Sequence, residues 1–366
     1  MIGALKRAWA NFRGFDLDGS TVPPMDGPLR PNSRLDAMPV LLRLEDVGNL
    51  VDAGGRLVCS VGEELLTLAQ GEGGLAIAER RSLGANITAI ASADGILALA
   101  VEGRGILIER PGSEPQLISG QGTPSACVTA MAFAGPSALF VAVGSAHNAA
   151  GQWKRDLMTK SASGSVWRID LSNGSARQLA RDLAFPSGIA VSGNGLFVSE
   201  AWRHRVRSLG QDGSDKGFAL SGLPAYPGGI APAASGGFWL AMFAPRNPLV
   251  EFVLKEDEYR RRMVETIDPA YWIAPSLLAG RSFLEPIQGG TRKKLNMLKP
   301  WSPTFSIGLV VRCDEHMGMQ RSYHSRADGD VHGVTSLCES GGRVLAAAQG
   351  SGKIVAIEEM TEQAAA

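Results

Sequence analysis

Residues 186–206 read PSGIAVSGNGLFVSEAWRHRV, and this stretch contains the pattern that decides the fold. An apolar run is followed by a short polar turn that ends in Gly195, and a second apolar run follows the turn. The pattern is typical of two antiparallel strands joined by a tight turn. Because repetition of such a unit determines the whole architecture, the question is how often it recurs.

The same unit occurs six times in the chain. The other copies begin at Glu45, Ile87, Val128, Pro227 and His332. Three of the five intervals between copies are about 41 or 42 residues long, which is the length of one four-stranded propeller blade. Six such sheets can close into a ring with few exposed edges. The sequence therefore predicts an all-β, six-bladed β-propeller.

Two long intervals contain insertions, and the chain begins with a separate segment. Residues 147–163 form a polar, turn-rich insertion in the third blade. Residues 244–305 interrupt the fifth blade, and apolar residues at helical spacing predict a helical insertion that acts as a lid, as an assembly surface or as a structural support. Residues 1–42 are interpreted as an N-terminal helix and a proline-rich lead-in, and residues 43–366 as one propeller domain.

The charge balance excludes one class of partner. Lys plus Arg and Asp plus Glu number 36 each in the 366 residues, so the formal net charge is zero. Nucleic-acid binding requires a surplus of basic residues, and the sequence has none. The expected partner is a small molecule held near the axis, where the inner strands of a propeller meet.

The cysteine spacing and the hydropathy of the chain indicate the cellular compartment that we expect for the protein. The four cysteines are far apart and lie in or beside apolar runs, which predicts buried, reduced thiols in a cytoplasmic protein. No stretch has the roughly 20 apolar residues needed to cross a bilayer. Residues 1–15 have an amphipathic pattern that either packs on the domain or contacts a membrane surface.

The C-terminal half resembles the strictosidine synthase-like branch of the calcium-dependent phosphotriesterase superfamily, which also contains gluconolactonases and paraoxonases. The matching motifs are FPSGIAVSGNGLFVSEAWRHRV, LPAYPGGIAPAASGGFWLAM, APRNPL, SIGLVVRCD and HGVTSLCESGGRVL, between Phe185 and Val355. The resemblance implies a six-bladed propeller, in agreement with the repeat count.

The resemblance also implies a calcium site, which this sequence departs from. Lactonases of the superfamily surround calcium with an acidic residue and several Asn or Asp side chains, in keeping with the preference of calcium for hard oxygen ligands. The matching positions here are Thr129, Ser187 and Gly228, and only Glu45 could supply the carboxylate. Calcium is therefore a weak expectation, with Glu45 as its one charged ligand.

Strictosidine synthases use a glutamate in the sixth blade as the acid and base of an amine–aldehyde condensation. The matching position here is Thr335, whose hydroxyl cannot shuttle protons near neutral pH as a carboxylate does.

A cluster of reactive side chains precedes the sixth blade, in SYHSRADGDVHGVT. His332 is the candidate general base, since imidazole titrates near neutral pH. Asp328 or Asp330 could orient His332, and Arg326 could bind a carboxylate or a developing oxyanion. The alternative is an ordinary turn whose His and Arg bind loop carbonyls.

Three functions remain open at this point. The first is a lactone or ester hydrolase with a degenerate metal site, in which Glu45 or His332 activates water and Thr129, Ser187 and Trp202 contact the substrate. The second is a non-catalytic ligand-binding or assembly propeller, which the loss of metal ligands favours. The third is an amine–aldehyde condensing enzyme, which would need an acid other than Thr335.

Overall fold

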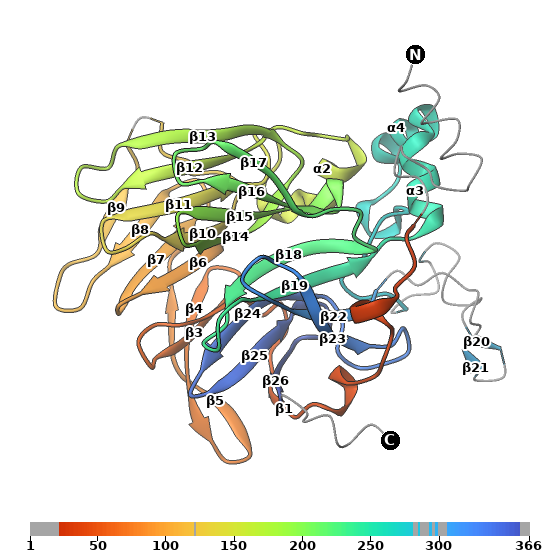
Figure 1. The fold of residues 1–366 in the computed structure, drawn as a ribbon, viewed down its shortest axis with the longest axis horizontal. Helices are drawn as coiled ribbons and strands as arrows, with labels where there is room; N and C mark the ends of the chain where they lie inside the picture. Colours follow the sequence, from red (N-terminus) through yellow and green to blue (C-terminus); the bar gives the residue numbers. More distant parts are fainter. Residues whose placement is uncertain are drawn as a thin grey trace.

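Six four-stranded sheets stand around one axis in the computed structural model, which describes residues 22–120, 122–280, 285, 293–294, 297–298 and 306–358 (Figure 1). The first strand of each repeat lies innermost, and these strands contact one another in the ring β2–β6–β10–β14–β18–β24. The predicted six-bladed β-propeller is therefore confirmed.

The first three blades follow the chain from the axis outward. Blade 1 contains β2 (Gly48–Asp52), β3 (Leu57–Val61), β4 (Glu64–Gly71) and β5 (Gly74–Ser82). Blade 2 contains β6 (Ile87–Ala93), β7 (Ile96–Val101), β8 (Gly105–Glu109) and β9 (Gln116–Ile118). Blade 3 contains β10 (Val128–Phe133), β11 (Ala138–Val143), β12 (Gly164–Asp170) and β13 (Ala176–Leu183).

The last three blades include the long insertion and the closure of the ring. Blade 4 contains β14 (Pro186–Ser192), β15 (Gly195–Glu200), β16 (Arg205–Gly210) and β17 (Asp215–Leu220). Blade 5 contains β18 (Ala225–Pro232), β19 (Phe238–Pro245), β22 (Gly308–Cys313) and β23 (Met319–Ser325). Blade 6 contains β24 (Val334–Ser340), β25 (Arg343–Ala348), β26 (Lys353–Ile357) and β1 (Val40–Arg43).

The second strand of each blade explains why the apolar runs are continuous rather than alternating. Strands β7, β11, β15 and β19 are buried along their whole length. A strand inside a blade is covered on both faces by neighbouring blades, so both sets of its side chains are apolar. The turns before these strands are tight: Asp94 and Gly95, between β6 and β7, both have positive φ, as a type I′ turn requires.

The ring is closed by a strand that the repeats did not indicate. Strand β1 pairs antiparallel with β26, with Val40 opposite Val355 and Arg43 opposite Lys353. The outermost strand of the sixth blade thus comes from the segment interpreted as a lead-in. This pairing joins the two ends of the described chain and leaves the ring without a gap between its first and last blades.

The insertions of blades 3 and 5 pack against each other. Blade 3 carries α2 (Trp153–Met158), preceded by the 3₁₀ turn η3 (Ala150–Gln152), and blade 5 carries α3 (Pro248–Lys255), α4 (Asp257–Thr266) and the turn η5 (Pro269–Tyr271). Asn247 and Pro248 start α3 as N-cap and first helical residue, because the Asn247 side chain accepts a hydrogen bond from the Leu249 backbone N–H. Helix α2 contacts α4, and both groups of helices lie on one side of the ring (Figure 1).

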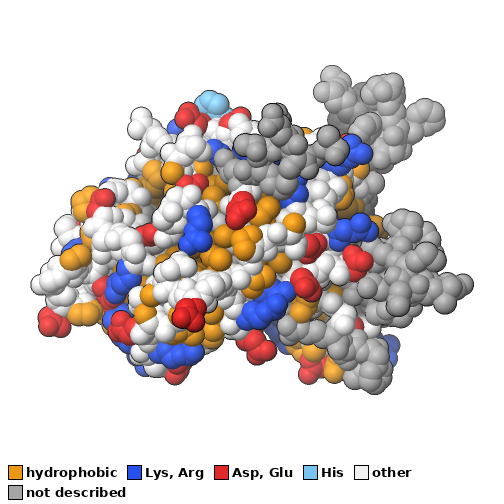
Figure 2. Space-filling view, turned by 90° about the horizontal axis from the view of Figure 1, so that it is seen from below, with side chains coloured by type: hydrophobic (Ala, Val, Ile, Leu, Met, Phe, Trp, Pro, Cys, Tyr) orange, Lys and Arg blue, Asp and Glu red, His pale blue; other side chains and the backbone are white. Residues whose placement is uncertain are grey.

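The structure bears on the predictions about the cysteines, the surface charge and membrane contact. The four cysteines are free and buried, and burial raises the pKa of Cys59 to about 12. Acidic and basic side chains are interspersed on the face seen in Figure 2, in keeping with the zero net charge. None of the helices in the described ranges is both long and apolar enough to cross a bilayer. The predicted N-terminal helix and its membrane contact lie outside the described residues.

Glu200 anchors the connection between blades 3 and 4. Its carboxylate is fully buried and accepts hydrogen bonds from Arg203 and Arg205, both at 2.6 Å, and from the backbone N–H of Ala184 at 3.0 Å. Burial alone would raise the pKa of Glu200, but the hydrogen bonds and the two guanidinium charges outweigh it and hold that pKa below its ordinary value.

We expect Glu200→Gln to lower the free energy of unfolding by about 1 to 3 kcal/mol at pH 7, since charge-assisted hydrogen bonds are lost at a buried site. A carboxyl group whose pKa is lower in the folded than in the unfolded protein stabilises the fold at pH values above its unfolded-state pKa. This contribution to stability is lost as the pH falls through the folded-state pKa. The difference from the parent protein should therefore be largest above about pH 5 and shrink toward pH 3. Urea unfolding at several pH values measures it, with the exposed Glu114→Gln as control; a pH-independent difference would contradict this account.

Candidate functional site

Each inner strand has a β-bulge near its beginning, and these bulges shape the site. The pairing between the first and second strands shifts register within the first half of the inner strand in all six blades. The residues at this point are Asn49, Thr88, Thr129, Ser187, the Gly228–Gly229 pair and Thr335. A bulge leaves a residue unpaired and redirects its side chain, and bulges are frequent next to functional sites.

Polar side chains stand at five of the six bulges and backbone at the sixth, Gly228–Gly229; together they are called the polar ring, and three of the side chains bind the next blade. Thr129 donates a hydrogen bond to the Pro186 carbonyl at 2.5 Å, and Ser187 donates one to the Pro227 carbonyl at 2.7 Å. The Asn49 amide donates to the Ile87 carbonyl at 3.3 Å. In each pair the acceptor lies at or near the beginning of the next inner strand, so the ring joins neighbouring blades.

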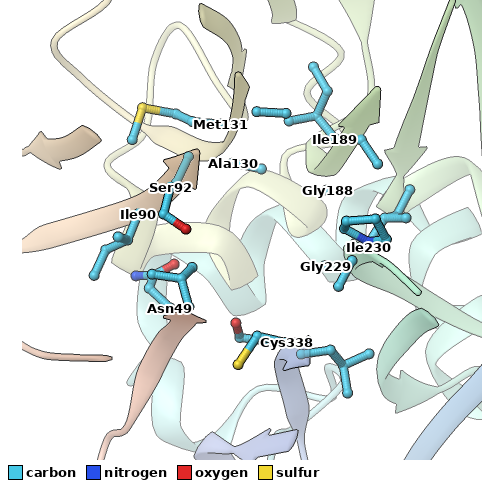
Figure 3. A pocket seen from close by; sticks show the side chains of 18 of the residues that line it. Asn49, Ile90, Ser92, Ala130, Met131, Gly188, Ile189, Gly229, Ile230 and Cys338 are labelled. Atoms are coloured by element: carbon cyan, nitrogen blue, oxygen red, sulfur yellow. The ribbon is translucent and has the colours of Figure 1, made fainter. Parts of the chain in front are cut away.

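The polar ring separates two cavities along the axis. The upper cavity lies where the inner strands begin and has a volume of about 670 Å³; the lower cavity lies toward their ends and has about 520 Å³. Asn49, Thr129, Ser187 and Thr335 line both. Figure 3 shows the lower cavity, with side chains from several inner strands arranged around an open centre. Both volumes are in the range of ligand pockets.

The wall of the upper cavity has two chemically different parts. Asp46, Asn86, Thr88 and Glu102 contribute the polar part, with Glu102 accepting hydrogen bonds from Asn86 at 3.3 Å and from the Ala150 backbone at 3.4 Å. The described residues that line this cavity include no Lys, Arg or His. Its polar wall therefore presents two carboxylates and no basic lining residue, while the nearby Lys154 ammonium lies 5.7 Å from the centroid of the Trp153 ring.

Aromatic rings form the other part of the wall. Trp153, Phe185 and Phe243 line the cavity, and the Trp153 and Phe243 rings meet edge to face with centroids 5.8 Å apart. Trp202 lies behind them, stacked on Phe185 at 4.6 Å. The indole N–H of Trp202 donates to the buried carboxylate of Asp156 in α2 at 2.8 Å, so the aromatic wall and the blade 3 insertion are fixed together.

The two insertions cover the upper cavity. Ala150, Gly151 and Trp153 of the blade 3 insertion and Leu277 of the blade 5 insertion are among its lining residues. The Leu277 carbonyl approaches the sixth blade so closely that a Cβ atom at Gly350 or Gly333 would overlap it. The part of the blade 5 insertion around Leu277, called the lid below, is thus seated on glycines that adjoin another blade.

We expect Gly350→Ala to displace this lid, because the added methyl group would occupy the position of the Leu277 carbonyl. Amide hydrogen exchange of residues 272–279 should become at least about tenfold faster while the blades keep their protection. Gly120→Ala is the matched control, since a Cβ atom there meets only one atom, at 4.0 Å, and its backbone does not have a positive φ. Equal exchange in both variants would show that the contact does not hold the lid.

Comparisons with known proteins agree with this architecture. No protein-family model matches the sequence. The luciferin-regenerating enzyme superposes with a TM-score of 0.54 at 12% identity, covering 86% of this chain and 92% of that one. A protein named as a candidate gluconolactonase superposes with a TM-score of 0.53 at 11% identity, covering 87% and 90%.

The chain has the fold of the gluconolactonase-type propellers. Two curated relatives are adipocyte plasma membrane-associated proteins. The one from Salmo salar is 30% identical over 186 residues, which are 49% of this chain and 38% of the relative; the one from Danio rerio is 31% identical over 98 residues, which are 25% and 24%. The chain thus matches well under half the length of either relative. The predicted resemblance to the superfamily is confirmed, and at these identities the structural likeness extends to the fold alone.

The polar ring does not fit the calcium site that the superfamily implies. Thr129 and Ser187 bring uncharged hydroxyls, Gly228 has no side chain, and the first blade contributes the amide of Asn49. Glu45, the expected carboxylate ligand and alternative base, is exposed and lines neither cavity. Calcium takes six to eight oxygen ligands with carboxylates among them. Within the described ranges no three His, Cys, Asp or Glu residues are grouped as metal ligands.

The residues of the predicted catalytic cluster, His332, Asp328 and Arg326, line neither axial cavity. His332 is buried, its Nε2 donates to the Arg326 carbonyl at 2.8 Å, and the Ser306 hydroxyl is 2.9 Å from its Nδ1. Asp328 is near the Arg326 guanidinium at 3.7 Å, and neither residue lines a cavity. His332 is thus held by Ser306, by the Arg326 carbonyl and, through its backbone N–H, by Ser351. The roles of His332 as base, Asp328 as its orienting group and Arg326 as an anion ligand stay predictions.

Two of the three residues predicted to contact the substrate through hydroxyls or an indole ring line the cavities. Some other cavity residues were not predicted from the sequence. Thr129 and Ser187 line both cavities, whereas Trp202 supports the wall from behind. Asp46 and Glu102 were not singled out from the sequence. The available signal was position: Glu102 directly follows the buried strand β7, in a turn at the same end of the blade as the start of the inner strand.

Proposed function

We propose that the protein binds a small organic molecule in the upper cavity without a bound metal ion. The observation that carries this proposal is the divided wall, with Asp46 and Glu102 on one part and Trp153, Phe185 and Phe243 on another. Such a wall is complementary to a molecule with an apolar or aromatic body and a cationic or hydrogen-bond-donating group. An anionic ligand would face two carboxylates with no basic residue among the described lining residues.

The covered position of the cavity supports ligand binding further. The lid around Leu277 and the α2 segment both contribute lining residues, so a bound molecule is surrounded by groups from the blades and from both insertions. Removal of water strengthens the interaction between a ligand charge and the carboxylates.

A second candidate is hydrolysis of a lactone or ester, as in the first of the functions predicted from the sequence. Glu102 is the group in position to act as a general base: its carboxylate would take a proton from water as the water oxygen attacks the ligand carbonyl. The tetrahedral intermediate would then break its C–O bond to the leaving alkoxide, which takes the proton back from Glu102. The Asn86 amide donates one of its hydrogens to Glu102, and its second hydrogen is the available donor toward the oxyanion. The condensation reaction is less favoured, because Thr335 occupies the position of the required acid.

Isothermal titration with phenethylammonium, phenylethanol and phenylpropionate tests the proposal, since the three share one ring and differ in charge. We expect phenethylammonium to bind at least about tenfold more tightly than phenylpropionate, because the carboxylates attract one and repel the other. Glu102→Gln should weaken phenethylammonium about three- to tenfold and leave phenylethanol nearly unchanged. Addition of a chelator should change neither affinity.

The exposed Glu72→Gln serves as the control for the loss of one negative charge. Tighter binding of phenylpropionate than of phenethylammonium, or equal effects of Glu102→Gln and Glu72→Gln, would overturn the proposal. A pH-stat assay with an aryl lactone decides the second candidate: turnover that Glu102→Gln abolishes would support hydrolysis, and no turnover by the parent protein would reject it.

A further inference from the structure

The lower cavity has an apolar wall built from several blades. Ile90, Met131, Ile189, Ile230 and Leu337 contribute to it, each from a different inner strand, and four of these five appear around the opening in Figure 3. Alanines of the same strands fill the spaces between them. Pro232 and Ala234, at the end of β18, are exposed, so the cavity reaches solvent where this strand ends.

The polar groups near the mouth of this cavity are already hydrogen bonded within the protein. Asp52 accepts hydrogen bonds from the Gly55 backbone at 2.6 Å and from Ser340 at 2.5 Å. Glu339 accepts from the Ala234 backbone at 2.9 Å and from the Trp239 indole at 2.7 Å. These bonds reduce the capacity of either carboxylate to bind a ligand, while their charges still repel anions.

The floor of the lower cavity contains one hydroxyl with a spare hydrogen bond. Thr129 and Ser187 donate to carbonyls of the next blade, as described above. The hydroxyl of Thr335, which lines the same floor, is buried and has no hydrogen-bond partner in the described part of the chain. Rotation about its Cα–Cβ bond would turn this hydroxyl toward the cavity without breaking a bond, whereas the other two would each lose one.

We infer that the lower cavity is a second binding site, for an uncharged molecule with an apolar chain and a hydrogen-bond acceptor at its inner end. The chain would lie against Ile90, Met131 and Leu337, and the acceptor would receive a hydrogen bond from Thr335. This site is distinct from the upper cavity and faces the opposite end of the axis. Its occupancy does not depend on the ligand proposed for the upper cavity.

The test uses 2-octanone and octanoate as probes, with the methyl resonance of Met131 as the local signal. Met131 is the one methionine among the described lining residues of either cavity, and Met131→Leu assigns its resonance. We expect 2-octanone to shift this resonance in a saturable manner. Octanoate should bind at least about tenfold more weakly, because Asp52 and Glu339 repel its carboxylate.

Thr335→Val, which keeps the shape of the side chain, should weaken 2-octanone binding about three- to tenfold, as expected for one neutral hydrogen bond. Thr88→Val is the matched control, since Thr88 occupies the equivalent bulge of blade 2 but lines only the upper cavity. Glu102→Gln should leave 2-octanone binding unchanged, which separates this inference from the proposal for the upper cavity. The inference is overturned if the Met131 resonance does not respond, if octanoate binds as tightly as the ketone, or if the two threonine variants behave alike.

Discussion

Hydrogen bonds between neighbouring inner strands are the interaction on which the rest of this structure depends. At the bulges, Asn49, Thr129 and Ser187 each donate a hydrogen bond to a carbonyl near the start of the next blade. One such bond contributes only about 0.5 to 1.5 kcal/mol. Because the blades form a closed ring, each of these bonds fixes the position of a blade relative to its neighbour.

The fifth blade contacts its neighbours through backbone atoms rather than through side-chain hydrogen bonds. Gly228 and Gly229 place backbone where the other blades have side chains: a Cβ atom at Gly188 would overlap the Gly228 carbonyl, and one at Gly229 would overlap the Thr335 carbonyl. Blades 4, 5 and 6 are therefore packed backbone against backbone. The tunnel is consequently asymmetric, with hydroxyl and amide groups on part of the ring and bare peptide on the rest. Among the residues that the structure describes, none is a hydrogen-bond partner of the Thr335 hydroxyl.

The fold could be predicted from the sequence because its basis is local. Each blade repeats an apolar strand, a glycine-containing turn and a fully apolar second strand, and these signals are visible in residues such as Asp94–Gly95 and in the run of β11. Strand β1 could not be found this way, because its pairing with β26 involves residues about 310 positions apart, as in Arg43 opposite Lys353, and four apolar or basic residues after a proline have no distinctive pattern.

The site was harder to predict from the sequence than the fold, because it depends on contacts that form only in the folded ring. Thr129 and Ser187 could be placed on the axis, because the resemblance matches them to ligand positions of the superfamily, and both do line the cavities. His332 has the right chemistry for a base, but its bonding to Ser306 and the Arg326 carbonyl is a property of the folded loop. Glu102 reaches the cavity because a turn of blade 2 lies beside the insertion of blade 3, and only the assembled ring shows this proximity.

The central claim is that the polar ring joins the blades and is not a ligand set for calcium. A crystal structure of the protein grown in millimolar calcium tests this most directly. The account predicts that the hydroxyls of Thr129 and Ser187 still bind the carbonyls of Pro186 and Pro227, with no ion on the axis. A calcium ion at about 2.3 to 2.6 Å from either hydroxyl would contradict it.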